Sequence, residues 1–256
     1  MTVPRSIVDV WTSFLLALCA VTDWLASNPG RRCPPLAVHD VHVWHVALDI
    51  SAARQAELWR SLSDEERARV ERHTTSNGRR RALAARGLTR AVLAGYLELP
   101  PAKPAIAVGP RGKPYLVGSS LAFNLTHKDD CALVAVARSD IGVDVERVGS
   151  VARAGQIAAR YFTAREREEL ATRSDAAAHL FFRRLWSAKE AYGKARGDGV
   201  TTRLADCEID LDRAPPTIRA NDGVAWRLWT LAPSPAFVGA VVAAEASVLA
   251  IFRFVE

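Results

Sequence analysis

The sequence has few cysteines and no long apolar run near its N-terminus, and each shortage excludes a class of protein. Its four cysteines are scattered without a Cys-x-x-Cys pair: Cys19, Cys33, Cys131 and Cys207. This spacing indicates neither a zinc knuckle nor a disulfide framework. The uninterrupted run FLLALCAV has only eight residues, which is too short to span a membrane. We therefore expect a cytoplasmic protein without a membrane segment.

The N-terminal residues 11–26 (WTSFLLALCAVTDWLA) have two interpretations. As a secretory signal they are weak, because only Arg5 is basic before the apolar run and no small-x-small cleavage site follows. The alternative is a helix, since side chains recur on one face at spacings of three, four and seven: Trp11, Phe14, Leu15, Leu18 and Val21 or Thr22. We expect residues 1–38 to form an extension with an amphipathic helix that packs on the body of the protein.

The charge of the chain suggests an anionic ligand. The 256 residues carry a formal net charge of +6, and arginines concentrate in residues 60–90 and 147–184. Nucleic acid and phosphate-bearing small molecules both fit this charge. Against nucleic acid, the sequence has no recognisable binding motif, and its seven tryptophans do not alternate with basic residues. We expect no nucleic-acid partner.

Apolar periodicity and turn residues predict an α+β protein with two halves, residues 39–145 and 146–256. The first half is predicted to contain strands over 41–49, 121–127, 131–137 and 141–147, and helices from 63 and over 79–97. The second half is predicted to contain helices over 156–161, from 163 and over 179–196, and strands over 207–211, 225–231, 235–245 and 249–255. Ser63 with Glu66, and Thr163 with Glu166, are predicted capping boxes.

The strand IGVDVER, residues 141–147, places two carboxylates side by side. With a period of two, Asp144 and Glu146 share one face, while Val143 and Val145 point to the other, buried face. Neighbouring carboxylates repel unless water, a cation or basic partners neutralise them. Two interpretations stay open here: a solvated strand end, or ligands for a hard divalent cation such as Mg²⁺.

The segment WSAKEAYGK, residues 186–194, supplies a third carboxylate and an ammonium. Glu190 and Lys194 are four residues apart, so they share a helical face with Trp186. As an isolated pair they would be a surface salt bridge worth about 0.3–0.5 kcal/mol. The large aromatic side chain on the same face indicates partial cover. A metal and pyrophosphate site would need such a carboxylate and ammonium.

Taken together, four motifs resemble those of the Sfp-type 4′-phosphopantetheinyl transferases. They are GKP (112–114), FNLTH (123–127), GVDVE (142–146) and WSAKEAYGK (186–194). The likeness runs from about residue 41 to 230, and Thr126 replaces the usual serine with another hydroxyl. The resemblance implies two similar α+β halves related by a pseudo-twofold axis, and a monomer with its site between the halves.

The resemblance also implies a reaction, in which the phosphopantetheine arm of coenzyme A moves to a serine of an acyl or peptidyl carrier protein and 3′,5′-ADP is released. It implies Mg²⁺ held by Asp144, Glu146 and Glu190, with Asp144 and Lys194 at the phosphates. Lys194 would also stabilise the leaving group. For the 3′-phosphate and adenine it suggests the following residues: Arg69, Arg81, Lys113, Thr126 and His127.

Three questions stay open at the level of sequence. The base for the serine hydroxyl is Glu190 or a metal-bound water or hydroxide, and Glu146 binds the metal directly or through water. The alternative class is a coenzyme A or carrier-protein binding module without catalysis; against it, all four of Asp144, Glu146, Glu190 and Lys194 are present. Polyketide and non-ribosomal peptide synthases are the pathways that similar two-halved enzymes serve, but the sequence does not name the carrier.

Overall fold

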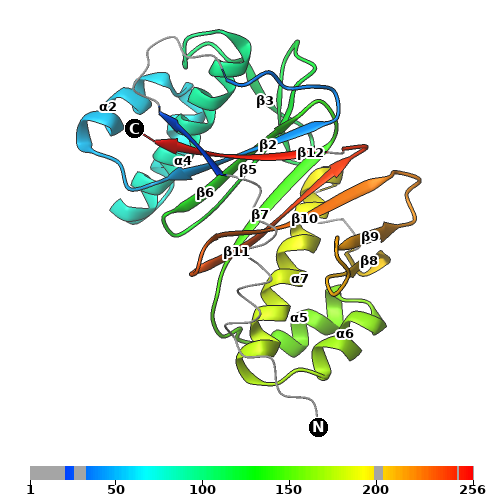
Figure 1. Cartoon of the computed structure of the whole chain (residues 1–256). Helices are drawn as coiled ribbons and strands as arrows, with labels where there is room; N and C mark the ends of the chain where they lie inside the picture. The colour runs from blue at the N-terminus through cyan, green and yellow to red at the C-terminus, as the bar shows by residue number, and fades with distance from the viewer. Residues whose placement is uncertain (1–20, 26–32, 199–203, 247, 256) are drawn as a thin grey trace.

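The computed structural model describes residues 21–25, 33–198, 204–246 and 248–255. Within these ranges two main sheets cross at the centre of the molecule, and helices cover the outer face of each (Figure 1). The predicted α+β class is confirmed. Across these same ranges, no helix is both long and apolar enough to cross a membrane.

The first sheet has five strands in the order β1-β12-β2-β6-β5. They are β1 (Val21–Leu25), β12 (Val248–Val255), β2 (Asp40–Ala47), β6 (Cys131–Ala137) and β5 (Ala122–Lys128). Three helices follow β2, and a short hairpin then leads to β5: α2 (Ala52–Ser61), α3 (Asp64–Glu71), α4 (Ser76–Leu97), β3 (Ile106–Val108) and β4 (Pro114–Leu116). Trp44, Leu88 and Val134 belong to the core between α4 and this sheet.

The second sheet has three strands in the order β10-β11-β7. They are β10 (Trp226–Ser234), β11 (Phe237–Ala244) and β7 (Ile141–Arg147). Its helices and the small neighbouring sheet are α5 (Ala154–Tyr161), α6 (Ala164–Ala171), α7 (Asp175–Arg196), η2 (Leu204–Asp206), β8 (Cys207–Asp210) and β9 (Thr217–Ala220). The long helix α7 packs on β7 and β11, with Phe182, Leu185 and Val242 in the core between them.

The inner faces of the two sheets share a third core, which contains Val43, Leu133, Val143 and Val241. Strand alternation explains this arrangement, because one face of each strand meets a helix and the other meets the opposite sheet. At the junction β5 lies beside β7, and the Asn124 side chain accepts a hydrogen bond from the backbone N–H of Val143 at 3.0 Å. Residues of the FNLTH and GVDVE motifs are thereby brought together.

Both predicted capping boxes are present. The side chains of Ser63 and Thr163 accept from the backbone N–H groups of Glu66 and Glu166, whose carboxylates accept from the cap N–H groups in return. The division of the chain near residue 145 stays a prediction, as does the pseudo-twofold axis. The C-terminal strand β12 lies in the first sheet, between β1 and β2.

The predicted N-terminal helix is wrong over Val21–Leu25, which forms β1. This strand pairs in parallel with β12, with Val21 opposite Ile251. Pairing satisfies backbone groups along the edge of β12, and the β-branched residues Val21 and Thr22 favour extended backbone. Apolar spacing over so few residues does not separate a helix from a strand. The rest of the predicted helix, residues 11–20, lies outside the described residues.

Candidate active site

Strand β7 and helix α7 meet at Gly142 without a side chain between their backbones. A Cβ atom at this position would lie 2.0 Å from the Ala191 carbonyl oxygen and 2.4 Å from the Ala195 nitrogen. Such distances exclude every residue except glycine, so Gly142 sets how closely α7 approaches the sheet. Alternation along β7 then directs Asp144 and Glu146 toward the α7 side, because Val143 and Val145 lie in the core between the sheets.

Asp144 is buried against Lys194, with only 6% of its surface exposed. The Lys194 ammonium donates to Asp144 Oδ1 at 2.6 Å and to the Val143 carbonyl at 3.2 Å, and the Thr126 hydroxyl donates to the same Oδ1 at 3.2 Å. Burial raises the pKa of Asp144, and the charge and hydrogen bond of Lys194 oppose that rise. The other oxygen, Oδ2, is buried without a hydrogen-bond partner, so it is a ready ligand for a cation.

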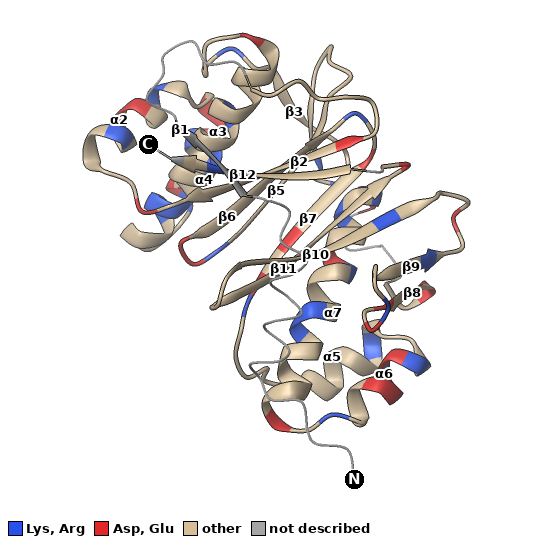
Figure 2. Ribbon diagram, viewed as in Figure 1, with Lys and Arg blue, Asp and Glu red and all other residues tan. Residues whose placement is uncertain are grey.

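Glu190 adds a second carboxylate to this region. Burial raises its pKa, the negative charge of Asp144 raises it further, and Glu146 contributes in the same direction. Lys194 lowers it and is the cation that partly offsets this repulsion. Three carboxylates therefore influence one another beside one ammonium. In Figure 2 an acidic (red) stretch of β7 lies beside α7, whose ribbon carries basic (blue) stretches.

Glu146 is held by a residue that the sequence did not single out. Arg183 donates to Glu146 Oε2 at 2.9 Å and to the Ser150 carbonyl at 3.1 Å, and the Lys128 ammonium lies 3.6 Å from the same Oε2. Arg183 precedes Glu190 by seven residues, so the helical repeat places both on one face of α7. From this seven-residue spacing, Arg183 could have been predicted to lie on the same side of α7 as the site.

The arrangement fits a hard divalent cation in its donor chemistry. Asp144 Oδ2 is an orphaned buried oxygen, and the pKa of Glu190 is raised by burial and then by the charge of Asp144, a repulsion that a bound cation would relieve. Glu146 is paired with Arg183. In the described part of the chain no group of three or more His, Cys, Asp or Glu side chains is already gathered as a metal cluster.

A cavity of about 510 Å³ opens beside these residues, and its wall includes residues of the turn before β4, of β5 and of α7. Lys113, Glu190 and Lys194 supply its ionisable lining, and Leu125, Trp186 and Leu204 are apolar parts of its wall. The ring of Tyr161, also in the wall, packs edge-on against Trp186 with centroids 5.4 Å apart. The helical face predicted for Trp186, Glu190 and Lys194 is therefore the face that lines the cavity.

His127 lies among cations. Its pKa is lowered first by burial and then by the positive charges of Arg86, His73, Lys194 and Arg81. Positive charge gathered around an imidazole that is exposed at the surface suits a phosphate group. Neither Arg86 nor His73 was singled out as a site residue from the sequence.

The other two predicted arginines lie less directly at this cluster. Arg81 donates to Asp130 at 2.9 Å, so an acidic residue partly neutralises it. The charge of Arg69 acts on Arg86, which in turn acts on His127. Arg69 thus belongs to the basic surroundings of the cluster.

Lys189, although it lies inside the WSAKEAYGK segment, points away from the cavity. It is fully buried, with Nζ 2.7 Å from Glu166 Oε2, and donates to the carbonyls of Leu204 at 2.8 Å and Cys207 at 2.5 Å. Glu166 also accepts from the Ile209 N–H at 2.8 Å. This satisfied pair anchors α7 to α6 and to the segment that carries Leu204.

Comparisons of the sequence with known proteins identify its relatives. One family model, 4′-phosphopantetheinyl transferase N-terminal, matches residues 51–139, and another, the 4′-phosphopantetheinyl transferase superfamily, matches residues 140–245. The 4′-phosphopantetheinyl transferase HetI of Nostoc sp. is 36% identical over 226 residues, which cover 86% of this chain and 93% of that protein. The transferase psf-1 of Bacillus pumilus is 31% identical over 177 residues, with 68% and 75% covered.

A solved holo-(acyl-carrier-protein) synthase from Bacillus anthracis, in complex with CoA (3′,5′-ADP), is 26% identical with a TM-score of 0.38. The match covers 43% of this chain and 97% of that one. The chain belongs to the 4′-phosphopantetheinyl transferase superfamily, on the strength of the family models and the similarity to HetI. The enzyme class inferred from the four motifs is thus confirmed.

Proposed function

We propose that this enzyme transfers the 4′-phosphopantetheine arm of coenzyme A to a serine of an apo acyl or peptidyl carrier protein. The serine oxygen forms a bond to the β-phosphorus, the bond from that phosphorus to the bridging oxygen breaks, and 3′,5′-ADP leaves. The observation that carries this proposal is the cavity where Glu190 and Lys194 stand beside buried Asp144. It combines a carboxylate base and a phosphate-binding cation at one place.

The positive groups would hold coenzyme A. Lys194 is free to exchange part of its contact with Asp144 for a phosphate oxygen, where it would stabilise the charge of the leaving group. The 3′-phosphate would lie near His127, with Thr126 as a hydroxyl donor and Arg81 and Arg69 as more remote charges. The cation cluster around His127 supports this placement.

Glu190 would accept the proton of the serine hydroxyl. A serine hydroxyl is a weak nucleophile at neutral pH and needs a positioned base. The raised pKa of Glu190, due first to burial and then to Asp144, makes its ionised form a stronger base than an exposed glutamate. A metal-bound water or hydroxide is the competing base.

Mg²⁺ is the proposed cofactor, held by Asp144 and Glu190 together with Glu146, which takes part directly or through a water. When bound, the ion neutralises pyrophosphate charge. The orphaned Asp144 Oδ2 supports this assignment. Titration of the metal-free protein by calorimetry should show one divalent site, weakened in Asp144→Asn.

We further propose a cytoplasmic monomer. The residues of the proposed site come from both halves of one chain, so no second copy is needed to complete it. The described thiols Cys33, Cys131 and Cys207 are free, which suits a reducing compartment. Polyketide and non-ribosomal peptide carriers are the proposed partners.

Mass spectrometry tests the proposed reaction. An apo carrier protein incubated with enzyme, coenzyme A and Mg²⁺ should gain the mass of one phosphopantetheine, and a carrier with its acceptor serine changed to alanine should not. A chelator should stop the gain and added Mg²⁺ should restore it. Apo carriers from fatty acid, polyketide and peptide pathways, assayed side by side, would identify the partner. Binding without mass gain across that panel would favour the non-catalytic binding module.

A further inference from the structure

Lys113, on the turn over 109–114 between β3 and β4, reaches across to the end of helix α7. Its ammonium donates to the Ala195 carbonyl at 2.6 Å, and Asp140 Oδ1 lies 3.8 Å away. Its aliphatic stem lies over Gly197, where an added Cβ atom would be 2.9 Å from Lys113 Cδ. Burial lowers the pKa of Lys113, with Asp140 opposing that change. The side chain is thus packed and hydrogen-bonded within the protein.

These contacts are those of a helix cap. The last carbonyls of a helix have no partner within the helix and carry the negative end of its dipole. At the end of α7 the Gly197 N–H donates to the Gly193 carbonyl at 3.1 Å, and Gly197 adopts a left-handed φ of 68°. Lys113 supplies a donor and a positive charge to a further terminal carbonyl, that of Ala195.

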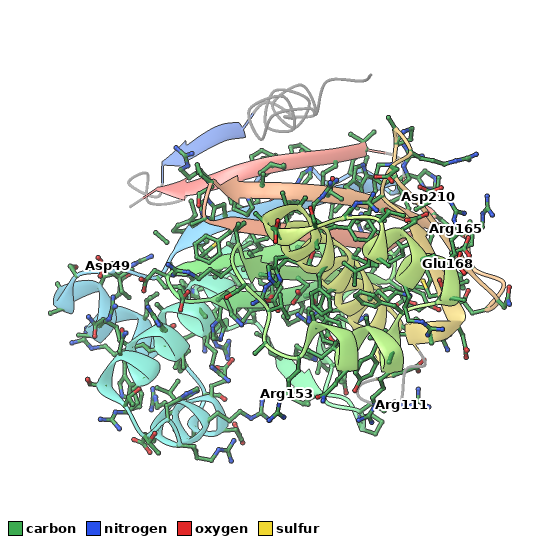
Figure 3. The ribbon with its side chains drawn as sticks, turned by 90° about the horizontal axis from the view of Figure 1, so that it is seen from below. Asp49, Arg111, Arg153, Arg165, Glu168 and Asp210 are labelled. Carbon is green, nitrogen blue, oxygen red and sulfur yellow. The ribbon has the colours of Figure 1, made fainter. Side chains whose placement is uncertain are left out.

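The capped turn carries Lys194 and continues the turn that carries Glu190. Lys194 directly precedes Ala195, and Glu190 lies one turn earlier on the same face. From the other side, Gly142 of β7 approaches the Ala195 nitrogen so closely that a Cβ atom would lie 2.4 Å from it. The site end of α7 is therefore clamped between β7 and the 109–114 turn. Arg111, labelled in Figure 3 on that turn, adds an ion pair with Asp198.

We propose that Lys113 is a positioning residue, which acts on transfer by fixing the last turn of α7 and hence Lys194 and Glu190. This role differs from the phosphate or adenine contact that the GKP motif suggested. Its kinetic consequences rest on the proposed transferase reaction. Its structural consequence, protection of the last turn of α7, does not depend on any substrate.

Lys113→Met is the informative variant, because methionine keeps an unbranched stem over Gly197 but has no ammonium donor. Lys113→Arg keeps a cationic donor and should recover part of any loss. Lys103→Met is the matched control, since it removes the same charge from an exposed position in the same half. Each protein is assayed with coenzyme A and with dephospho-coenzyme A. Hydrogen exchange of the backbone amides is measured on the ligand-free enzymes.

The expected result for Lys113→Met is a kcat lower by about ten- to a hundredfold with both donors, because small misplacement of reacting groups is costly. The ratio of the two KM values should stay that of the wild type. Amides at the end of α7, around Gly197, should exchange faster in ligand-free protein, and Lys103→Met should match the wild type in every measurement.

Two results would overturn the proposal. A selective rise in KM for coenzyme A over dephospho-coenzyme A, with unchanged exchange, would make Lys113 a 3′-phosphate ligand. If both the kinetics and the hydrogen exchange stayed unchanged, Lys113 would neither position α7 nor bind the 3′-phosphate. If the wild-type enzyme showed no transfer, the exchange comparison would still decide whether Lys113 caps α7.

Discussion

Asp144 and Glu190 lie close enough for their negative charges to repel each other. This repulsion favours the binding of a cation or of a proton at the site. Burial raises the pKa of both carboxyl groups, the charge of Asp144 raises that of Glu190 further, and Lys194 opposes both shifts. Selection for stability alone would favour apolar side chains at these positions. Retaining the carboxyl groups suits a protein that brings a cation or takes up a proton at this point.

Replacing Glu190 with glutamine should separate binding from chemistry. Glu190→Gln keeps the size and polarity of the side chain but cannot accept the serine proton, so kcat should fall by about 10²–10⁴-fold. Calorimetry should show coenzyme A binding close to that of the wild type. Glu168→Gln, at an exposed glutamate labelled in Figure 3, is the control and should turn over normally. Near-wild-type turnover of Glu190→Gln would assign the base to another group.

His127 should make coenzyme A binding depend on pH. Burial and then the positive charges of Arg86, His73, Lys194 and Arg81 lower its pKa from the usual value of 6.5, which favours the neutral imidazole in the free protein. A bound 3′-phosphate favours the imidazolium, and binding should therefore take up a proton near that pH. Calorimetry in buffers of different ionisation enthalpy measures the uptake.

The uptake should be smaller in His127→Gln and with dephospho-coenzyme A. Equal uptake in the variant and the wild type would remove His127 from the phosphate site.

The lowered pKa of His127 also makes the stability of the folded protein depend on pH. The folded state binds fewer protons than the unfolded state as pH falls through about 6.5, so wild-type stability decreases on acidification. His127→Gln should lose less stability over that interval in urea titrations.

Among the elements, the contact of β7 with α7 is the most sensitive to added volume. Gly142→Ala would place a methyl group 2.0 Å from the Ala191 carbonyl, and both neighbours are backbone atoms that move only with the whole helix. We expect destabilisation of at least about 1–3 kcal/mol, the usual cost of overpacking, together with loss of transfer. Urea unfolding of the purified variant measures the first effect.

The matched control is Gly155→Ala on helix α5, where an added Cβ atom meets nothing within 4 Å. That substitution should stabilise the protein by about 0.4–1 kcal/mol, because alanine reduces the conformational entropy of the unfolded chain. If Gly142→Ala behaved like Gly155→Ala, the close approach of β7 and α7 would not set the geometry of the site.

The sequence predicted elements better than it predicted their partners. Strand alternation located the carboxylates of β7 on one face, and helical spacing put Glu190 and Lys194 on the cavity face of α7, because both patterns are local. The contact of Arg183 with Glu146 depends on how α7 lies across the sheet, which no local pattern records. For the same reason, the pairing of Val21 with Ile251 was not visible, and a helix was predicted instead.

At the scale of the whole molecule, the two main sheets are interlocked by the path of the chain. The last strand, β12, lies between β1 and β2 in the first sheet, and β7 takes the chain from the first sheet into the second. The core between the sheets contains residues of both, such as Val43 and Val241. Neither sheet can unfold without exposing this shared apolar surface to water.

The shared core predicts one cooperative unfolding transition. Leu88→Ala in the first helix-covered core and Leu185→Ala in the second each remove a side chain that is at most 1% exposed. Each should cost about 2–5 kcal/mol. Hydrogen exchange at increasing urea, read on peptides from α4 and from α7, reports on the two halves separately. If the halves unfold together, either substitution lowers both midpoints by the same amount. A Leu88→Ala protein whose α7 peptides keep the wild-type midpoint would show that the halves unfold independently, and that the core between the sheets contributes little to their coupling.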